Sequence, residues 1–257
     1  MFEHTSATKI KSFLFCPESF YISDHLKYNV EKYQKQEFFA LGTKFHEFVE
    51  NNGEAEVLNA TDAMAKKMYE SVKTDLEKYT RNPDSIKEGM LKTVFEVKDL
   101  EPYNKNKTKL NKVTVWSVID NYQILEEDKK VRVVDWKTSK SMWVDESMMK
   151  QPRIYAWMLW RQEPDAQSFE VMLYFAKLKA EGKKPYTYPH NGLNKEPKFD
   201  KIGIEELKEI DEFMKRVTVE MIEYVNYRES GGEPKILGKK SPLCAYKSCH
   251  EKCKLFD

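Results

Sequence analysis

A predicted hairpin of two apolar strands is the feature that most constrains the fold of this 257-residue chain. Residues 113–125 and 131–134 are rich in Val and Ile and read as strands, and the charged segment 126–129 reads as the turn between them. In an unbulged hairpin about this turn, Asp120 faces Asp135. Directly opposed residues point to the same face with Cβ atoms roughly 5 Å apart. The fold must therefore accommodate two neighbouring carboxylates.

Two carboxylates this close need a cation or a proton between them. Lys137 follows Asp135 by two residues, so the period of a strand places its ammonium on the same face. One interpretation is a solvated strand face that Lys137 neutralises. The flanking sequences VWSVID and VRVVDWK are apolar on both sides of the acids and instead favour burial, where a hard divalent cation with oxygen ligands would offset the cost.

The remaining pattern predicts an α/β fold with a mixed sheet. Helices are expected from Ser6 or Thr8 to Pro17, over about 37–51 and 61–80, within 145–161, and from about Ile204 to Tyr227. A β region is expected to begin at Val94, Val97 and Leu100, and a buried strand over Phe169 to Phe175; residues 180–201 read as a loop.

Composition limits the classes of protein. The chain has 43 Lys and Arg against 42 Asp and Glu, so DNA binding would require segregated basic residues, for which Lys177, Lys179, Lys183 and Lys184 are candidates. With 40% hydrophobic residues, disorder is excluded. The longest apolar run, residues 155–160, is too short to cross a bilayer, and no secretory signal is present, so a cytoplasmic protein without membrane contact is expected.

Three of the four cysteines, Cys244, Cys249 and Cys253, lie in the last fourteen residues, and Cys16 is the distant fourth. Without a secretion signal, clustered cysteines indicate metal or redox chemistry before disulfides. Four thiolates can hold an iron-sulfur cluster or a tetrahedral Zn²⁺. The alternative is a set of free thiols on a flexible tail.

The pattern D-x14-D-x-K, with the second acid and the lysine in a strand, resembles the core of the PD-(D/E)XK nuclease superfamily, and more narrowly its RecB-like exonuclease branch. That branch adds a histidine on an upstream helix, matched by His46 in GTKFHEFVE, and a Q-x-x-x-Y helix, matched by Gln151 and Tyr155. These features occur in the expected order.

The resemblance implies a restriction-endonuclease-like mixed β-sheet flanked by helices. It implies one RecB-like domain over 1–257, with its core at about 37–178 and a Cys-rich segment, 233–257, packing back on the N-terminal helix. It also implies that His46, Asp120, Asp135 and the carbonyl of Trp136 bind Mg²⁺ or Mn²⁺. The implied catalytic residues are Asp120, Asp135, Lys137, Gln151 and Tyr155.

Three features depart from the family pattern. Ser117 stands where the family usually has Gly, three residues before the first acid. Pro152 follows Gln151 directly, so either the helix begins there or it is kinked. The terminal cysteines are spaced C-x4-C-x3-C, whereas the AddB-type and CRISPR-adaptation relatives have C-x2-C-x5-C. The resemblance still implies a 4Fe-4S cluster on Cys16, Cys244, Cys249 and Cys253, with Zn²⁺ as the alternative.

The expected function is that of a Mg²⁺- or Mn²⁺-dependent deoxyribonuclease, an exonuclease or end-processing enzyme of recombination, repair, phage DNA metabolism or CRISPR adaptation. Its expected partners are DNA, single-stranded or duplex with an end, and proteins of recombination or CRISPR adaptation. The alternatives are a noncatalytic DNA-binding scaffold that keeps the fold, and a redox-sensing cluster protein. Intact Asp120, Asp135 and Lys137 argue against both.

Overall fold

The computed structural model describes residues 2–26, 36–80, 86–125, 129–139, 146–183, 187–189 and 198–234. The chain divides into two compact units that are each assembled from separate stretches of sequence. The first unit comprises Met1–Lys35, Lys92–Ser117 and Glu209–Asp257, and the second comprises Gln36–Leu91 and Val118–Lys208. The prediction of one domain with a core at 37–178 stays a prediction.

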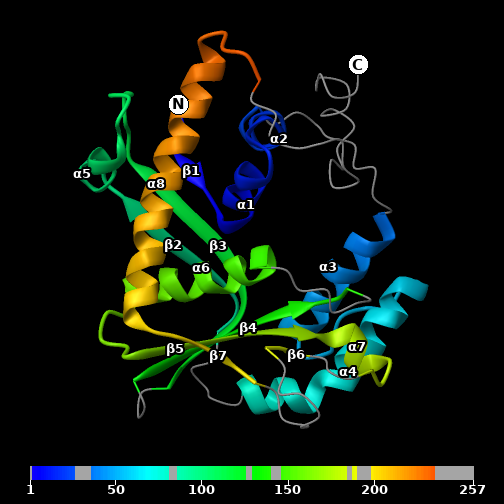
Figure 1. The fold of residues 1–257 in the computed structure, drawn as a ribbon. Helices are drawn as coiled ribbons and strands as arrows, with labels where there is room; N and C mark the ends of the chain where they lie inside the picture. The colour runs from blue at the N-terminus through cyan, green and yellow to red at the C-terminus, as the bar shows by residue number, and fades with distance from the viewer. Residues whose placement is uncertain are drawn as a thin grey trace. The chain divides into compact units, whose positions relative to one another are not determined.

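The second unit is built on a mixed β-sheet (Figure 1). Its strands are the end of β3 (Val113–Leu125), β4 (Lys130–Lys137), β5 (Ser168–Phe175), β6 (Thr187–Tyr188) and β7 (Asp200–Ile202). β4 runs antiparallel to β3 and parallel to β5 along its whole length, while β6 and β7 are both antiparallel to β5. The predicted α/β class with a central mixed sheet flanked by helices is confirmed.

Helices cover both faces of this sheet. α3 (Gln36–Glu50) and α4 (Ala60–Thr80) pack their apolar side chains against Trp136 and Tyr174 in one buried cluster. Alternate residues of a strand point to opposite faces, so Asp135 and Lys137 point away from that cluster. On their side α6 (Glu146–Gln162) packs on β4 and β5. The short helix α7 (Ala176–Ala180) follows β5 directly and packs on α4 (Figure 1).

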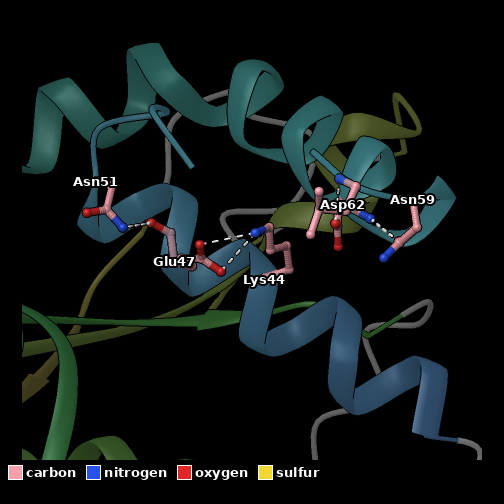
Figure 2. A network of polar contacts seen from close by, with 6 residues as sticks. Lys44, Glu47, Asn51, Asn59 and Asp62 are labelled. Carbon is pink, nitrogen blue, oxygen red and sulfur yellow. Dashed lines mark hydrogen bonds and ion pairs between the residues drawn. The ribbon is translucent and has the colours of Figure 1, made fainter. Parts of the chain in front are cut away.

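Polar side chains make local contacts in the second half of α3 and at the start of α4 (Figure 2). Near the end of α3, Lys44 pairs with Glu47 at 3.0 Å, and the Asn51 side chain donates to the Glu47 carbonyl at 2.9 Å. Before α4, the Asn59 side chain accepts the backbone N–H of Asp62 at 3.0 Å. This is the bonding of a helix N-cap. The Asn51 side chain thus bonds to the last turn of α3, and Asn59 caps the first turn of α4.

The first unit joins the N-terminal segment to the long helix α8 (Ile204–Glu229), which belongs to this unit from Glu209 onward. β1 (His4–Thr5) pairs in parallel with Thr114 and Val115 of β3. α1 (Ala7–Phe15) is capped by Ser6, as expected, and α2 (Pro17–Phe20) and the π-helical turn η1 (Tyr21–His25) follow. The buried carboxylate of Glu18 accepts from Tyr224 at 2.6 Å and from Arg228 at 3.0 Å, which holds α2 on α8.

Three expectations about secondary structure were wrong. The β region starts earlier, as β2 (Ile86–Phe95), and Val97–Leu100 forms a helical turn, α5, followed by the 3-10 turn η2 (Glu101–Tyr103). Val97 and Leu100 are three residues apart, a helical spacing that was taken for a strand. The expected loop 180–201 contains β6 and the start of β7. In the described part of the chain, no helix combines the length and apolarity that crossing a membrane requires.

Candidate active site

The two carboxylates of the hairpin lie where β3 and β4 separate. The ladder pairs Asn121 with Val134, which is the predicted register, and Asp120 and Asp135 are the next residues along each strand. Beyond this point the carboxylate of Asp120 takes the place of a strand carbonyl, because its Oδ2 accepts the backbone N–H of Trp136 at 2.6 Å. Asp135 is buried with 1% exposure, whereas Asp120 is partly accessible.

Lys137 balances the buried charge of Asp135. Its Nζ lies 2.5 Å from Oδ2 of Asp135. Burial favours the neutral form of Lys137, but the charge and hydrogen bonding of Asp135, helped by the charge of Asp120, outweigh burial and raise the pKa of Lys137 above 10.5. Lys137 is therefore a protonated cation at neutral pH.

His46 reaches this pair from α3. A Cβ on Gly42 of α3 would lie 3.4 Å from Oγ1 of Thr138, so the helix passes close to the chain just after β4. His46 stands one turn further along α3, and its Nδ1 is 3.9 Å from Oδ1 of Asp120. Gly42 is thus a sequence signal for this close approach.

α6 adds a polar pair on the other side of Lys137. The Lys137 ammonium donates to Oε1 of Gln151 at 3.4 Å, and Nε2 of Gln151 donates to the hydroxyl of Tyr155 at 2.5 Å. The helix begins at Glu146, so Gln151 is not its cap and Pro152 lies inside the helix. Of the two alternatives for Pro152, a helix that begins at Gln151 is thereby excluded. Even so, Gln151 and Tyr155 share one helix face as the i, i+4 spacing requires.

The structure thus brings together all the predicted site residues of the sheet, α3 and α6. A chain of contacts runs from His46 through Asp120 to the backbone of Trp136, and a second one from Asp135 through Lys137 to Gln151 and Tyr155. Of the predicted cysteine site, Cys16 is buried between α1 and α2, and Cys244, Cys249 and Cys253 lie outside the described residues.

The donor atoms suit a hard divalent ion, although no group of three or more His, Cys, Asp or Glu side chains is close enough to form a ready-made metal site among the described residues. Mg²⁺ bonds are about 2.1 Å long, so one ion can touch both His46 Nδ1 and Asp120 Oδ1 across 3.9 Å. The buried Oδ2 of Asp135 contacts the Lys137 ammonium, and its second lone pair could bind a cation. The residues therefore fit such an ion.

The structure shows which of the basic residues expected beside the site pair with acids. Lys179 pairs with Asp75 of α4 at 3.3 Å, and Lys183 pairs with Glu181, so each ammonium already has an acidic partner. Lys184 lies outside the described residues. Lys177 is buried in α7, and within the described ranges it has no hydrogen-bond or ion-pair partner. Among the three members that the structure describes, Lys177 is therefore the one without an acidic partner.

Two contacts behind the site, one between aromatic rings and one hydrogen bond, were not predicted from the sequence. The indole of Trp136 packs on the ring of Tyr174, with centroids 4.9 Å apart. The hydroxyl of Tyr174 in turn donates to Asp75 of α4, the same carboxylate that binds Lys179. Because Tyr174 stands in the apolar run 171–175 of β5, no sequence signal distinguishes it from a simple core residue. These contacts hold the residue whose backbone binds Asp120.

Comparison with known proteins gives one family. The model of the PD-(D/E)XK nuclease superfamily matches residues 4–250. The crystal structure of a protein from Eubacterium rectale, named as a candidate exonuclease, superposes with a TM-score of 0.53 at 12% identity, covering 94% of this chain and 87% of that one. This likeness concerns the fold alone. The protein SSO0001 gives a TM-score of 0.41 at 12% identity over 86% of this chain and 76% of its own. No curated protein sequence matches the chain.

Proposed function

Because the chain belongs to the PD-(D/E)XK nuclease superfamily, we propose that it is a metal-dependent deoxyribonuclease that uses the site around Asp120, Asp135 and Lys137. The observation that carries the proposal is the pair of strand carboxylates with a protonated lysine 2.5 Å from the buried one. A structural salt bridge would not require the second carboxylate and a histidine to converge on the same strand ends.

Nucleases of this superfamily generally use divalent metals such as Mg²⁺. In our proposal His46, Asp120, Asp135 and the Trp136 carbonyl hold Mg²⁺ or Mn²⁺, which lowers the pKa of a bound water and offsets negative charge on the phosphate. The single imidazole favours Mn²⁺ among the hard ions. Trp136 contributes further by fixing the Asp120 carboxylate through its backbone N–H.

Lys137 acts in this proposal as a fixed positive charge. Its raised pKa keeps it protonated, so it donates hydrogen bonds to the attacking water or to a phosphate oxygen and does not take up a proton. Its bond to Gln151 limits where the ammonium can move. Preorganised charge of this kind lowers the barrier most where the transition state gains negative charge.

Gln151 and Tyr155 position Lys137 and the DNA backbone. The Gln151 amide gives one hydrogen to Tyr155 while its oxygen accepts from Lys137. A phenol hydroxyl both accepts and donates hydrogen bonds, so the side chain of Tyr155 is chemically suited to contact a phosphate oxygen. We assign both residues to substrate positioning in an exonuclease or end-processing reaction, in keeping with the name given to the Eubacterium rectale protein.

We further propose that Cys16, Cys244, Cys249 and Cys253 bind a 4Fe-4S cluster, with Zn²⁺ as the alternative. The proposal rests on the four-thiolate set and on the burial of Cys16. Iron and sulfide analysis of anaerobically purified protein tests it, with Cys16→Ser expected to lose the metal. Protein containing neither iron nor zinc would contradict it.

The test of the nuclease itself is cleavage of end-labelled single- and double-stranded DNA with Mg²⁺, with Mn²⁺ and with EDTA. Cleavage should require the metal and should disappear in Asp135→Asn, which keeps the size of the side chain and removes its charge. Metal-independent cleavage, or full activity in this variant, would refute the proposal. DNA binding by folded wild-type protein without cleavage would favour the noncatalytic scaffold.

A further inference from the structure

Basic residues are concentrated in one surface loop of the described chain, and the loop itself contains no acidic residue. The loop Asn104–Lys112 has the sequence NKNKTKLNK, with four lysines and no acidic residue, in a chain whose charges nearly cancel. It connects the turn η2 to β3 within the first unit. Such local segregation is what a protein of nearly zero net charge needs in order to bind a polyanion.

Three of these lysines carry uncompensated charge. Lys105, Lys107 and Lys109 are exposed, and none of them has an ion pair or hydrogen bond from its side chain with any described residue. Lys112 differs because it pairs with Glu96 at 3.0 Å. Lysines on the helices are commonly neutralised by an acid one turn away, as Lys208 is by Glu205.

The loop is held in shape, so the three ammonium groups project from a fixed backbone. Asn104 closes it by accepting the backbone N–H of Thr108 at 2.9 Å and donating to the Thr108 carbonyl at 2.7 Å. At its far end Asn111 donates to the carbonyl of Phe2 at 2.6 Å. Lys107 adopts a φ of +52°, a left-handed conformation that is unfavourable for lysine. A fixed loop loses less conformational entropy when it binds a ligand.

Nearby acids do not cancel this charge. Glu96 is occupied by Lys112, and Glu212 of α8 accepts the hydroxyl of Tyr103. Asp99 is bound to the backbone N–H of Glu96 as part of a helix cap. Glu101 is the remaining acid just before the loop, and it balances one of the three uncompensated charges at most.

We propose that Asn104–Lys112 binds the phosphodiester backbone of nucleic acid, independently of base sequence. Lysine ammonium groups are point charges that suit phosphates, whereas base recognition commonly uses the bidentate geometry of arginine. The loop has no arginine and no aromatic residue for stacking on bases. It also lacks the aromatic anchors of a membrane-surface segment, and Leu110 is its only large apolar residue, so nucleic acid fits better than anionic lipid.

This inference extends the proposed function, because it names a contact with DNA outside the cleavage site, but it can be tested separately. Binding of a fluorescent 30-base-pair duplex is measured by anisotropy in EDTA, where no metal-dependent cleavage occurs, at a series of salt concentrations. The slope of log K against log salt falls by about 0.9 for each phosphate contact that is lost. The triple variant Lys105→Gln, Lys107→Asn, Lys109→Gln should therefore reduce the slope by up to roughly 2.7. Asn is chosen at position 107 because it tolerates the left-handed conformation.

The matched control is the triple variant Lys66→Gln, Lys67→Gln, Lys73→Gln on α4. These lysines are also exposed and the change in net charge is the same, but they share their helix with Glu70. The control should keep the wild-type slope, and so should a loop variant with three arginines. If the slope falls equally in the control and in the loop variant, the effect is due to net charge alone and the proposal is overturned.

Two further outcomes separate this proposal from the others. If the loop variant keeps the wild-type slope but no longer binds vesicles that contain anionic lipid, the ligand of the loop is a membrane surface and the inference is overturned. Wild-type protein that shows a salt-dependent slope carried by the loop, but cleaves no DNA with metal, would refute the nuclease and leave the loop assignment intact. Melting curves of both triple variants establish that they are folded.

Discussion

The backbone N–H of Trp136 donates to the carboxylate of Asp120 at 2.6 Å, so a side chain replaces the backbone acceptor at the point where β3 and β4 part. One carboxylate oxygen is thereby fixed by the sheet, and the other faces Nδ1 of His46. The indole of Trp136 is meanwhile held on Tyr174 in the core. The hydrophobic cluster under the sheet therefore determines where the Asp120 carboxylate lies.

This arrangement separates two roles of Asp120 by mutation. Asp120→Asn keeps an oxygen that can accept from Trp136 but removes the negative charge, and Asp120→Leu removes both. Asn should leave unfolding nearly unchanged and weaken Mn²⁺ binding about tenfold or more, as loss of a charged ligand does. Leu should in addition cost about 1–3 kcal/mol of stability for the buried N–H left without an acceptor. Calorimetric Mn²⁺ binding equal to wild type in both variants would mean that Asp120 is not a ligand.

Lys137 and a divalent metal should compete to neutralise Asp135. Lys137→Met leaves a buried carboxylate without its cation, which should destabilise the metal-free protein by about 3 kcal/mol or more. Added Mg²⁺ should then raise the melting temperature of this variant more than that of wild type, while cleavage is lost. Lys130→Met is the matched control, because Lys130 lies on the same strand, pairs with Glu170 and is equally accessible, at 23% against 22%.

In the control variant, Mg²⁺ should shift the melting temperature as it does in wild type and DNA cleavage should persist. The same Mg²⁺ shift in Lys137→Met and Lys130→Met would show that the metal does not bind at Asp135.

The pKa of Lys137 gives a pH dependence of stability. Its folded pKa is raised above 10.5, so the stabilisation from its charge is complete below about pH 10 and is lost as the pH rises through the folded pKa. The difference in unfolding free energy between wild type and Lys137→Met should therefore be flat from pH 8 to 10 and fall above pH 10.5. Urea unfolding across this range measures it. A difference that falls already between pH 8 and 9 would contradict the raised pKa.

The sequence determined the local geometry of the site better than its surroundings. The hairpin register followed from a turn and two apolar runs, because a slip by one residue would reverse every side chain of the strand. Its consequence, Asp120 beside Asp135, followed with it. The bond from Trp136 to Asp120 could not be foreseen, since it depends on where the backbone ladder ends.

Contacts between distant segments were the least predictable. Nothing in the sequence around Lys179 indicates Asp75, which lies on another helix, yet that pair removed Lys179 from the expected phosphate contacts. Pro152 was expected to mark a helix start or a kink, and it lies inside α6, which begins six residues earlier at Glu146 and packs on β4 and β5. Tertiary packing overrode a local preference in that case.

His46 should affect metal preference more than folding. Imidazole is a borderline ligand that Mn²⁺ accepts better than Mg²⁺ does, so His46→Ala should lose more activity in Mn²⁺ than in Mg²⁺. The ratio of the two single-turnover cleavage rates measures this, and the melting temperature controls for packing. A ratio equal to that of wild type would mean that His46 has only a structural role beside Asp120.

Lys177 provides the last prediction, which rests on the proposed nuclease. It is buried two residues after Phe175, the residue of β5 that pairs with Lys137, so its backbone lies near the end of β4 that carries Lys137. A buried ammonium without a partner among the described residues costs stability unless an anion meets it, and a DNA phosphate beside the scissile one is such an anion. Lys177→Met should therefore melt at the wild-type temperature or above it.

The same variant should bind DNA about tenfold more weakly, as loss of one charged hydrogen bond of about 1.5 kcal/mol implies. Lys179→Met on the same helix is the control, and it should leave binding unchanged because Lys179 is committed to Asp75. Lys177→Met should therefore keep or gain stability while it loses affinity for DNA, a combination that is expected only if Lys177 binds the substrate. A variant that loses stability and keeps its affinity for DNA would make Lys177 an ordinary structural lysine of α7.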